Sequence, residues 1–379
     1  MRVLVLGAGY AGVTLARRLE SCLPAEAELV VVDESDSHLV QHEVHRVIRH
    51  PSLAETIRVP LGQLFDRAEV RVARVEGIDR EARTVRLDGG TTLDYDYAAV
   101  CLGSATAYYG LPGVEEHSLP LKSVADAEAI RESFLAAAAA NDAVNVVVGG
   151  AGLSGVQTAG ELAALADEED VTASITVVEQ LEDVAPNFPR NFREAVRDEL
   201  EARCIDVRTG TTVQRATAEA VETDAGTFAY DTFVWTGGIA GQAAMGGDRP
   251  TVRSDLRLDA RTFVVGDAAR IVDADGEAVP ASASAALREA NTVAKNVARL
   301  VRHETDADPD DFAPRMEPYR FDVPGWIVSV GDGAVAQLGP TVVTGSAAKA
   351  MKASVGAGHL GSVGAVKNAV ELVEEELSG

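Results

Sequence analysis

The 379-residue sequence contains only three cysteines, five lysines and 5% aromatic residues. Cys22, Cys101 and Cys204 lie far apart and show neither the spacing of a disulfide framework nor that of a zinc site. The sequence also lacks a recognisable signal peptide and any uninterrupted apolar run of about 18 residues. We therefore expect a metal-free protein of the cytoplasm, which would meet the inner face of the cell membrane only as a peripheral protein.

Basic residues are scarce as well. The chain has 34 Lys and Arg residues against 59 Asp and Glu residues, a formal net charge of -25. Such a charge repels a phosphate backbone and argues against a nucleic-acid partner. An acidic, lysine-poor composition resembles that of proteins from salt-accumulating archaea, because molar salt shortens the Debye length to ~3 Å and screens the self-repulsion. The alternative is an ordinary acidic protein.

Two glycine-rich segments, which we call fingerprints, carry the strongest signal. Residues 7–12 read Gly-Ala-Gly-Tyr-Ala-Gly and residues 150–155 read Gly-Ala-Gly-Leu-Ser-Gly, each between a β-branched apolar run and a helix-like stretch. Asp33 and Glu179 end the next apolar run after each fingerprint, at the offset where a carboxylate binds ribose hydroxyls. The two patterns predict two dinucleotide-binding sites.

Each glycine of a fingerprint has a separate physical reason. The first turns the chain sharply, the second removes a Cβ where the pyrophosphate approaches, and the third lets the helix pack against the strand. The phosphates then lie at the positive end of the helix. A glycine turn that merely joins a strand to a helix explains a single match, but it explains two matches with acidic partners poorly.

The order of apolar runs predicts an α/β fold with two Rossmann-like domains. A strand, a glycine turn, a helix and a second strand fill residues 2–33, and the same parts recur over residues 144–179. A further strand is expected at residues 70–75, and the first domain resumes with a strand at residues 262–267. A hairpin around Gly331-Asp332-Gly333 and a Gly- and Ala-rich helical tail close the chain.

The motifs resemble, along nearly the whole chain, those of flavoproteins with two dinucleotide-binding sites. Besides the fingerprints they include Cys101-Leu102-Gly103 at a strand end, Thr236-Gly237-Gly238 and the late pair Gly266-Asp267. The resemblance implies three regions, with FAD in the first and NAD(P)H in the second. They are an FAD-binding domain of residues 1–110 and 243–310, an inserted NAD(P)H-binding domain of residues 111–242, and a hairpin and helical tail of residues 311–379.

The resemblance also implies which residues hold each cofactor. Asp267 would contact the ribityl and pyrophosphate part of FAD. Glu179 would repel the 2'-phosphate of NADPH, and no arginine follows to neutralise it, so NADH is the expected coenzyme. The full set for FAD is Gly7, Gly9, Tyr10, Ala11, Gly12, Asp33, Glu34, His38, Val75, Gly103, Gly266 and Asp267. The set for NADH is Gly150, Gly152, Gly155, Glu179 and Gly238.

Two further segments look like type II NADH dehydrogenases, which reduce quinones with NADH. They are Leu119-Pro120-Leu121-Lys122-Ser123 and Val279-Pro280-Ala281-Ser282-Ala283. The resemblance implies hydride transfer from nicotinamide to flavin, and then transfer of two electrons to an acceptor in a separate pocket. We expect catalytic roles for Lys122, close to the flavin, and for Glu161. The alternative for Lys122 is a cap on a surface turn.

The sequence departs from that family on the acceptor side. The quinone-associated pattern A-Q-x-A-x-Q reads Ala283-Ser284-Ala285-Ala286-Leu287-Arg288, and Gln157 stands where a glutamate commonly follows the second fingerprint. Quinone is the preferred acceptor. The alternatives are a small iron–sulfur protein as acceptor, or a non-catalytic flavin- or dinucleotide-binding redox sensor. The cysteine positions fit neither disulfide reductases nor sulfide-oxidising relatives.

Two weaker signals concern metal ions. His38, His42 and His45 have helical spacings that would suit a metal site, but a lining of the flavin or acceptor pocket, or plain surface positions, explain them better. Asp273-Ala274-Asp275-Gly276 echoes part of a calcium loop, although the other ligands are missing and a hairpin turn fits better.

The tail carries three of the five lysines, Lys349, Lys352 and Lys367, among apolar residues at near-helical spacing. This pattern would suit an interfacial anchor on a membrane surface. Its four glycines weaken a helix by up to ~1 kcal/mol each, and aromatic residues are absent there. The alternatives are packing against the flavin domain or against a second subunit in a homodimer.

Overall fold

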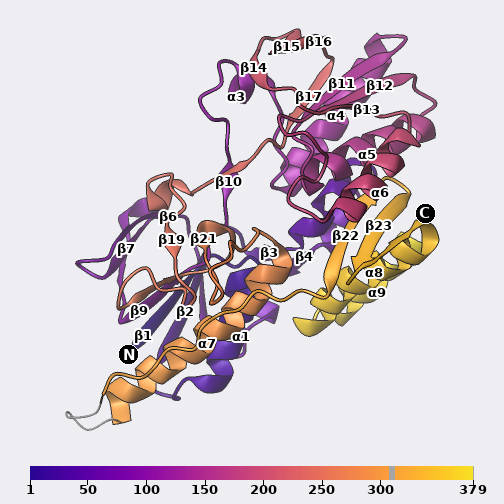
Figure 1. Cartoon of the computed structure of the whole chain (residues 1–379). Helices are drawn as coiled ribbons and strands as arrows, with labels where there is room; N and C mark the ends of the chain where they lie inside the picture. The colour runs from indigo at the N-terminus through magenta and orange to yellow at the C-terminus, as the bar shows by residue number, and fades with distance from the viewer. Residues whose placement is uncertain (307–311, 379) are drawn as a thin grey trace. The chain divides into compact units, whose positions relative to one another are not determined.

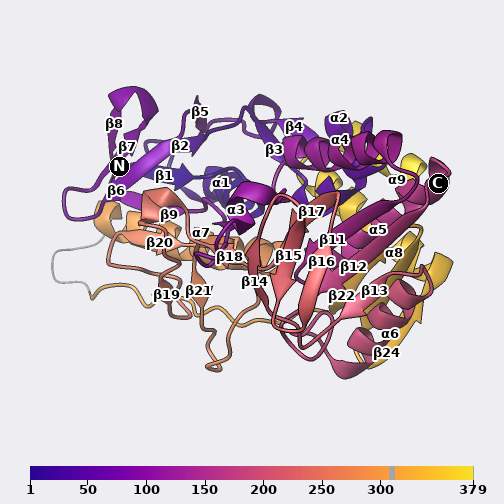
Figure 2. The ribbon, with the colours of Figure 1, turned by 90° about the horizontal axis from the view of Figure 1, so that it is seen from above.

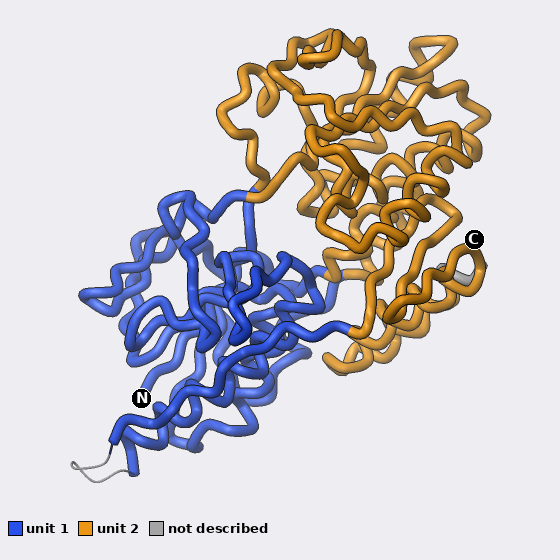
Figure 3. The backbone as a smooth tube through the Cα atoms, in the orientation of Figure 1, with its two compact units in different colours: residues 1–39, 58–105, 240–323 blue, residues 40–57, 106–239, 324–379 orange. Residues whose placement is uncertain are grey.

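The computed structural model describes residues 1–306 and 312–378 and divides into two compact units (Figure 3). Unit 1 consists of Met1–Leu39, Arg58–Ala105 and Ala240–Val323. Unit 2 consists of Val40–Ile57, Thr106–Ile239 and Pro324–Gly379. Each unit is therefore assembled from three separate stretches of the chain.

Unit 1 is built on a five-stranded parallel sheet with the order β20-β9-β1-β2-β5. Helices α1 (Tyr10–Cys22) and α7 (Ala283–Asp306) pack against each other beside it (Figure 1). An antiparallel sheet, β6-β7-β8, completes the unit. The strands are β1 (Arg2–Leu6), β2 (Glu28–Asp33), β5 (Glu69–Val72), β6 (Val75–Asp79), β7 (Thr84–Leu87), β8 (Thr92–Asp94), β9 (Tyr97–Val100) and β20 (Thr262–Val264).

Unit 2 repeats this plan with a parallel sheet of order β17-β11-β12-β13 and an antiparallel sheet of order β14-β15-β16. Its helices are α4 (Val124–Ala140), α5 (Leu153–Glu168) and α6 (Arg190–Glu201). The strands are β11 (Val144–Gly149), β12 (Ala173–Val178), β13 (Asp206–Arg208), β14 (Val213–Ala216), β15 (Ala220–Thr223), β16 (Gly226–Ala229) and β17 (Thr232–Trp235).

The strand orders confirm the α/β fold with two Rossmann-like sheets. In spatial order, β9-β1-β2-β5 of unit 1 corresponds to β17-β11-β12-β13 of unit 2, and β20 is an additional edge strand. The central strands β1, β2, β11 and β12 are Val-, Leu- and Ile-rich and almost wholly buried, as expected for parallel strands covered on both faces. Each fingerprint follows the first strand of its sheet.

The C-terminal part of unit 2 is a small antiparallel sheet covered by two helices. The hairpin expected around Gly331 is formed by β22 (Gly325–Val330) and β23 (Gly333–Leu338), and a third strand, β24 (Thr341–Thr344), joins it. Helix α8 (Gly345–Ser362) packs on this sheet and on α9 (Val366–Ser378), and Figure 2 shows α8 beside β22. In the described part of the chain, no helix is long and apolar enough to cross a membrane.

The compact units differ from the domains expected from the sequence. Residues 40–57 were expected with the first domain and the tail as a region of its own, whereas both belong to unit 2. The reason is packing: the 3-10 helix η1 (Gln41–Ile48) lies against α4 and α5, and helix α2 (Leu53–Thr56) lies against α9. Segment 40–57 is thus an excursion of the chain from unit 1 into unit 2.

Two local expectations have different outcomes. The single strand expected at residues 70–75 is wrong, because the chain changes sheets there and forms the separate strands β5 and β6. The hairpin turn at residues 273–276 is confirmed. Asp273 Oδ1 accepts hydrogen bonds from the N–H groups of Asp275 and Glu277, so the carboxylate closes its own turn.

Candidate functional site

The first fingerprint joins β1 to α1 in unit 1. Gly7 has a φ of +100°, which residues with a side chain rarely adopt, and its N–H donates to Val32 O at 2.7 Å. A Cβ on Gly12 would lie 1.7 Å from Gly7 O, so glycine is required for α1 to approach the turn. A Cβ on Gly9 would meet nothing within 4 Å, which leaves open space at the start of α1. The three glycines therefore meet the three requirements of a pyrophosphate site.

The second fingerprint, between β11 and α5 in unit 2, has the same geometry. Gly150 has a φ of +98°, a Cβ on Gly155 would lie 1.9 Å from Gly150 O, and a Cβ on Gly152 would meet nothing within 4 Å. Gly238 follows β17 in the same unit, and a Cβ there would lie 2.0 Å from the hydroxyl oxygen of Tyr109. Its glycine thus makes room for a tyrosine side chain.

An acidic side chain closes each fingerprint. Asp33 Oδ2 accepts from Ala8 N–H at 2.5 Å, and Glu179 Oε2 accepts from Ala151 N–H at 2.8 Å. In both residues the other carboxylate oxygen accepts from the N–H two residues further along, at 2.8 Å and 2.9 Å. Burial raises the pKa of Asp33, and its two backbone hydrogen bonds oppose that rise. Because each carboxylate oxygen can accept a second hydrogen bond, both residues can still bind ribose hydroxyls.

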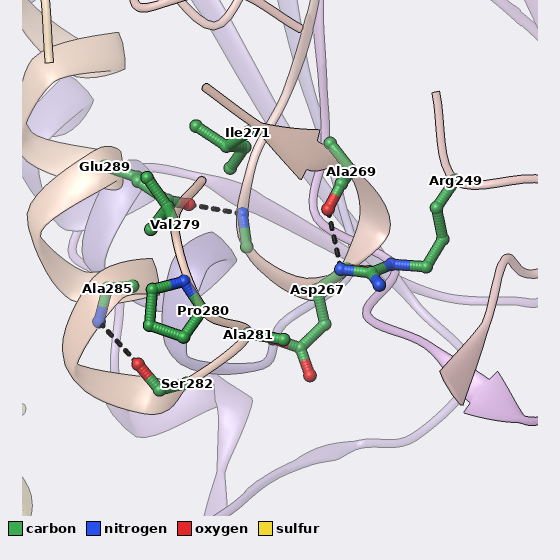
Figure 4. Close-up of a pocket in the computed structure, with 11 residues that line it drawn as sticks. Arg249, Asp267, Ala269, Ile271, Val279, Pro280, Ala281, Ser282, Ala285 and Glu289 are labelled. Atoms are coloured by element: carbon green, nitrogen blue, oxygen red, sulfur yellow. Dashed lines mark hydrogen bonds between the residues drawn. The ribbon is translucent and has the colours of Figure 1, made fainter. Parts of the chain in front are cut away.

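A polar pocket surrounds the late Gly-Asp pair in unit 1 (Figure 4). Gly266, with a φ of +69°, begins the short 3-10 turn η5 (Gly266–Ala268), and Glu289 Oε2 accepts from its N–H at 2.7 Å. On the other side of the turn, Arg249 donates from Nε to Asp267 O and from Nη2 to Ala269 O, both at 2.7 Å. An acidic and a basic side chain therefore fix the turn that carries Asp267.

The other residues expected at the FAD site also lie in unit 1. The ring of Tyr10 packs edge-on against His38, with 5.4 Å between ring centroids, and His38 Nδ1 lies 2.9 Å from Ala8 O in the fingerprint. Glu34 pairs with Arg74 at the exposed surface. Ala11 and Val75 are buried, and Gly103 has a φ of +66° after β9.

The three histidines do not share a helix face. His38 lies on strand β3 (Ser37–Leu39) in unit 1, whereas His42 and His45 lie on η1 in unit 2. Among the residues that the structure describes, no group of three or more His, Cys, Asp or Glu side chains is placed to hold a metal ion. His38 is buried beside the first fingerprint, so the surface position considered for it is wrong.

The expected catalytic residue Glu161 lies on α5 in a buried polar cluster of unit 2. Glu161 is 3% exposed, and its Oε1 lies 3.9 Å from His45 Nε2. The same nitrogen lies 2.8 Å from Ser329 Oγ and 3.3 Å from Gln157 Nε2. Burial, with the positive charge of Lys352, holds the pKa of His45 well below its usual range, so the imidazole is neutral at physiological pH. The cluster brings together residues from three distant parts of the sequence, η1, α5 and β22.

Lys122, the other expected catalytic residue, immediately precedes the N-cap of α4. Its N–H donates to Asp126 Oδ2 at 2.8 Å, and its carbonyl accepts from Gln41 Nε2 at 3.5 Å. The capping box of α4 is made by Ser123 and Asp126. The helix cap therefore belongs to its neighbours and not to the Lys122 side chain, which is partly exposed.

All three cysteines are free. Cys101 is buried, and burial raises the pKa of its thiol. Cys22 is half-buried with a raised pKa from the same cause, and Cys204 is exposed. The raised pKa values disfavour the thiolate, the reactive form, at Cys22 and Cys101.

Sequence reasoning missed the buried charges. Arg249 and Glu289 at the Gly-Asp pair were not foreseen. Lys352, for which an interfacial anchor and a packing contact were both considered, is 3% exposed and donates to Glu43 Oε2 at 2.9 Å. Burial alone would raise the pKa of Glu43, but Lys352, His42 and Arg46 together hold it well below its usual range. For Glu289 a signal exists, since Ala285, Ala286 and Val293, one turn away on the same helix, are apolar. For Lys352 there is none, because its partner is 309 residues away.

The comparison with protein families gives a clear result. Residues 1–290 match the model of the pyridine nucleotide-disulphide oxidoreductase family, and the chain belongs to this family. Among curated proteins, the type II NADH:quinone oxidoreductase of Staphylococcus epidermidis is 27% identical over 339 residues, which cover 81% of this chain and 84% of that protein. The protein of the same name from Staphylococcus aureus is 26% identical over 336 residues, 80% of this chain and 83% of that protein.

Solved structures share the fold. NDH2 from Plasmodium falciparum in complex with NADH matches with a TM-score of 0.84 at 13% identity and covers 99% of this chain and 97% of its own. The sulfide:quinone oxidoreductase from Aquifex aeolicus matches with a TM-score of 0.79 at 19% identity, over 97% and 92% of the two chains. A ferredoxin reductase from Rhodopseudomonas palustris matches with a TM-score of 0.72 at 20% identity, over 89% and 82%.

Proposed function

We propose that this chain is an FAD-dependent oxidoreductase that takes hydride from NADH and passes two electrons to a quinone. The observation that carries the proposal is the pair of fingerprints with one backbone geometry, each complete within its own compact unit. A chain with two such sites can hold a resident flavin dinucleotide and an exchanging nicotinamide dinucleotide. The likeness to type II NADH:quinone oxidoreductases over 81% of the chain supports this choice of substrates.

FAD fits the site of unit 1. The open space at Gly9 leaves room for the pyrophosphate at the start of α1, Asp33 offers acceptors to ribose, and the fixed turn presents Asp267. When bound, the flavin accepts hydride from NADH and releases electrons to the acceptor. We expect the substitution Asp267→Ala to release FAD. Full flavin absorbance after gel filtration of this variant would contradict the assignment.

NADH fits the site of unit 2 in the same way. Gly152 leaves open space at the start of α5, and Glu179 places a carboxylate where ribose hydroxyls would bind. The carboxylate disfavours the additional phosphate of NADPH through charge repulsion. The residue after next, Leu181, is exposed and uncharged, so it offers no compensating cation.

For the catalytic step we propose separate roles for Lys122 and Glu161. Lys122 would stabilise negative charge on the reduced flavin, which is the role that the resemblance to type II NADH dehydrogenases implies for it. Glu161, which is buried 3.9 Å from the neutral imidazole of His45, would be the carboxyl group that delivers a proton to the reduced acceptor. Gln157, which cannot ionise, would orient this pair through its amide.

The acceptor is proposed on the balance of two observations. Burial raises the pKa of the Cys22 and Cys101 thiols, which disfavours the reactive thiolate at both and argues against a disulfide or a sulfide as the substrate. At the altered quinone-associated pattern, Arg288 Nη1 donates to Ser284 O at 3.0 Å and to Ser284 Oγ at 2.5 Å. These two side chains satisfy each other, so quinone recognition would rest on other residues.

Anaerobic stopped-flow mixing in high salt tests the proposal. Rapid bleaching of the bound flavin by NADH, followed by rapid return of colour with a soluble menaquinone analogue, is the expected result. Bleaching without return would leave FAD and NADH in place and overturn quinone as the acceptor, in favour of a protein such as a small iron–sulfur carrier. Absence of bleaching would overturn the enzyme and favour a redox sensor.

We further propose that the protein works at molar salt on a membrane surface, through the tail. The net charge of -25 supports the first part. The exposed Val355, Val366 and Val370 on α8 and α9 support the second, with exposed Lys367 between them. Co-sedimentation with anionic vesicles, lost in the triple substitution of these valines by Ser, is the expected result. Loss of a dimer in that variant would assign the surface to a second copy instead.

A further inference from the structure

Glu289 is a buried acid behind the proposed FAD site. It lies on α7 with 1% exposure, and its neighbours one turn away, Ala285, Ala286 and Val293, are buried as well. Its Oε2 accepts from Gly266 N–H at 2.7 Å, and no lysine or arginine pairs with it in the described part of the chain. This position is unfavourable for a charged carboxylate, because ionising a buried carboxyl group that has no cationic partner costs free energy.

The hydrogen bond to Gly266 fixes the turn that presents Asp267. Gly266 has a φ of +69°, and a Cβ there would lie 3.3 Å from the Cβ of Ala286 and 3.5 Å from that of Ala11. The turn is thus wedged between α7 and α1, the helix of the first fingerprint. Glu289 holds this turn through its hydrogen bond to Gly266 N–H (Figure 4). A change in the charge of Glu289 therefore changes both the strength of that hydrogen bond and the electrostatic repulsion with Asp267.

The surroundings of Glu289 bring the pKa of its carboxyl group close to neutral pH. Burial raises the pKa of Glu289 to about 7, the bond from Gly266 N–H opposes the rise, and the negative charge of Asp267 adds to it. The other groups that interact with Glu289 electrostatically are the buried thiol of Cys101 and the phenol of Tyr319, both neutral at this pH. Arg249 lines the same pocket but bonds the backbone of the turn.

We propose that Glu289 is a positioning residue of the FAD site that takes up a proton from solvent when the dianionic cofactor binds, so that FAD binds more tightly as the pH falls through neutrality. The proposal rests on the assignment of FAD to unit 1. The added negative charge of the pyrophosphate favours the neutral acid, as a like charge does. By linkage, protonation of Glu289 must then favour the cofactor equally.

The sign of the pH dependence follows directly. Below pH 7 the acid is already neutral in the free protein, and FAD affinity does not depend on it. Above pH 7 binding must bring a proton from solvent, so the association constant falls by up to about tenfold per pH unit until the pH passes the pKa of the FAD-bound state.

FAD titrations of the full-length protein freed of flavin, between pH 6 and pH 9, test the proposal by flavin fluorescence. For the unaltered protein we expect FAD to bind at least about threefold more weakly at pH 8 than at pH 6. Glu289→Gln keeps an acceptor for Gly266 N–H but does not ionise, and its affinity should be equal at the two pH values. Glu289→Ala loses the acceptor and should bind more weakly at every pH.

A matched control and a second readout separate this role from a general charge effect. Glu304→Gln removes the same charge from the same helix, where Glu304 pairs with Arg261, and should keep the slope of the unaltered protein. Proton uptake on mixing with FAD in weak buffer at pH 8 should be smaller in Glu289→Gln than in the unaltered protein. Equal slopes and equal uptake would overturn the role of Glu289, whereas no FAD binding at any pH would overturn the proposed function instead.

Discussion

The two fingerprint sites are alike in their backbone and different in what lies behind it. Their first glycines have φ values of +100° and +98°, and their third glycines are excluded from bearing a Cβ by the same carbonyl contact. Behind the first site, Glu289 pairs with no lysine or arginine of the described residues, and burial raises its pKa to about 7. In unit 2, by contrast, Glu43 is surrounded by Lys352, Arg46 and His42, and is held ionised.

The difference teaches that nucleotide recognition and domain construction follow separate rules. The strand, turn and helix define the pyrophosphate site wherever they occur, because the requirements on the glycines are local. The buried charged residues, in contrast, differ between the units, because each unit packs a different segment or cofactor against its sheet. Unit 1 holds the cofactor proposed to be permanent, and unit 2 holds an excursion of the chain and the C-terminal tail.

Gly155→Ala should disable the proposed NADH site and leave the proposed FAD site intact, which is the largest difference between the two sites that we expect. Its Cβ would lie 1.9 Å from Gly150 O, and a backbone clash of this kind cannot be relieved by a side-chain rotation. We expect the rate of flavin reduction at low NADH to fall at least about a hundredfold, equivalent to ~3 kcal/mol, while FAD stays bound. Stopped-flow reduction and flavin absorbance measure the two effects. The control Gly152→Ala faces open space, so it should weaken NADH binding without lowering the melting temperature.

Lys352→Met should destabilise unit 2 without touching unit 1. It leaves Glu43, which is 1% exposed, without its nearest cation but still beside Arg46, so we expect the free energy of unfolding to fall by about 3 kcal/mol, the lower end for a broken buried pair. Urea unfolding monitored by circular dichroism measures this loss. The matched control is Lys367→Met, whose ammonium is exposed and pairs with Glu371 on the same helix. A control variant as unstable as Lys352→Met would show that the buried pair has no special role.

Glu179→Ala should narrow the preference for NADH over NADPH by about tenfold, which corresponds to ~1.4 kcal/mol of removed repulsion. The ratio of kcat/KM for the two coenzymes measures it, with the neighbouring exposed Glu182→Ala as control. Asp33→Ala should leave the ratio unchanged, because it belongs to the other fingerprint. An unaltered ratio in Glu179→Ala would remove this residue from the ribose site.

The acid side of the stability profile should reflect unit 2. The folded-state pKa of His45 lies well below its ordinary value of 6.5, so stability is present above pH 6.5 and is lost as the pH falls below it. The expected slope is up to about 1.4 kcal/mol per pH unit from this one group. Unfolding curves recorded between pH 5 and pH 7 measure this slope. In His45→Gln the free energy of unfolding should depend less on pH over the same range. Glu43 adds a loss with the same sign below its ordinary pKa of 4.5.

The sequence was sufficient where the determinants are close together in the chain. Asp33 lies 25 residues from the backbone N–H of Ala8 that it binds, and Glu179 lies 28 residues from Ala151, so one strand–turn–helix–strand pattern contains each partnership. Both parallel sheets and the hairpin at Gly331 follow from such local patterns. This explains why the fold class and the fingerprints were predictable.

The buried charges were not predictable because their partners are distant. Lys352 in an amphipathic tail has the same appearance as an interfacial lysine until Glu43, 309 residues earlier, is known to face it. Segment 40–57 follows the strand β3 without any break in composition, and its packing on α5 and α9 is a property of the folded chain. Arg249 lies outside the regular elements and carries no pattern at all.

The excursion of residues 40–57 has a consequence for how the protein is made. The chain passes between the units five times, after Leu39, Ile57, Ala105, Ile239 and Val323. Unit 1 lacks its edge strand β20 and the whole of helix α7 until Asp306 has been synthesised, and Lys352 is synthesised 309 residues after its partner Glu43. Both units therefore complete their folding late in synthesis, and the emerging chain must keep two unfinished sheets from aggregating, which is the situation that chaperones serve.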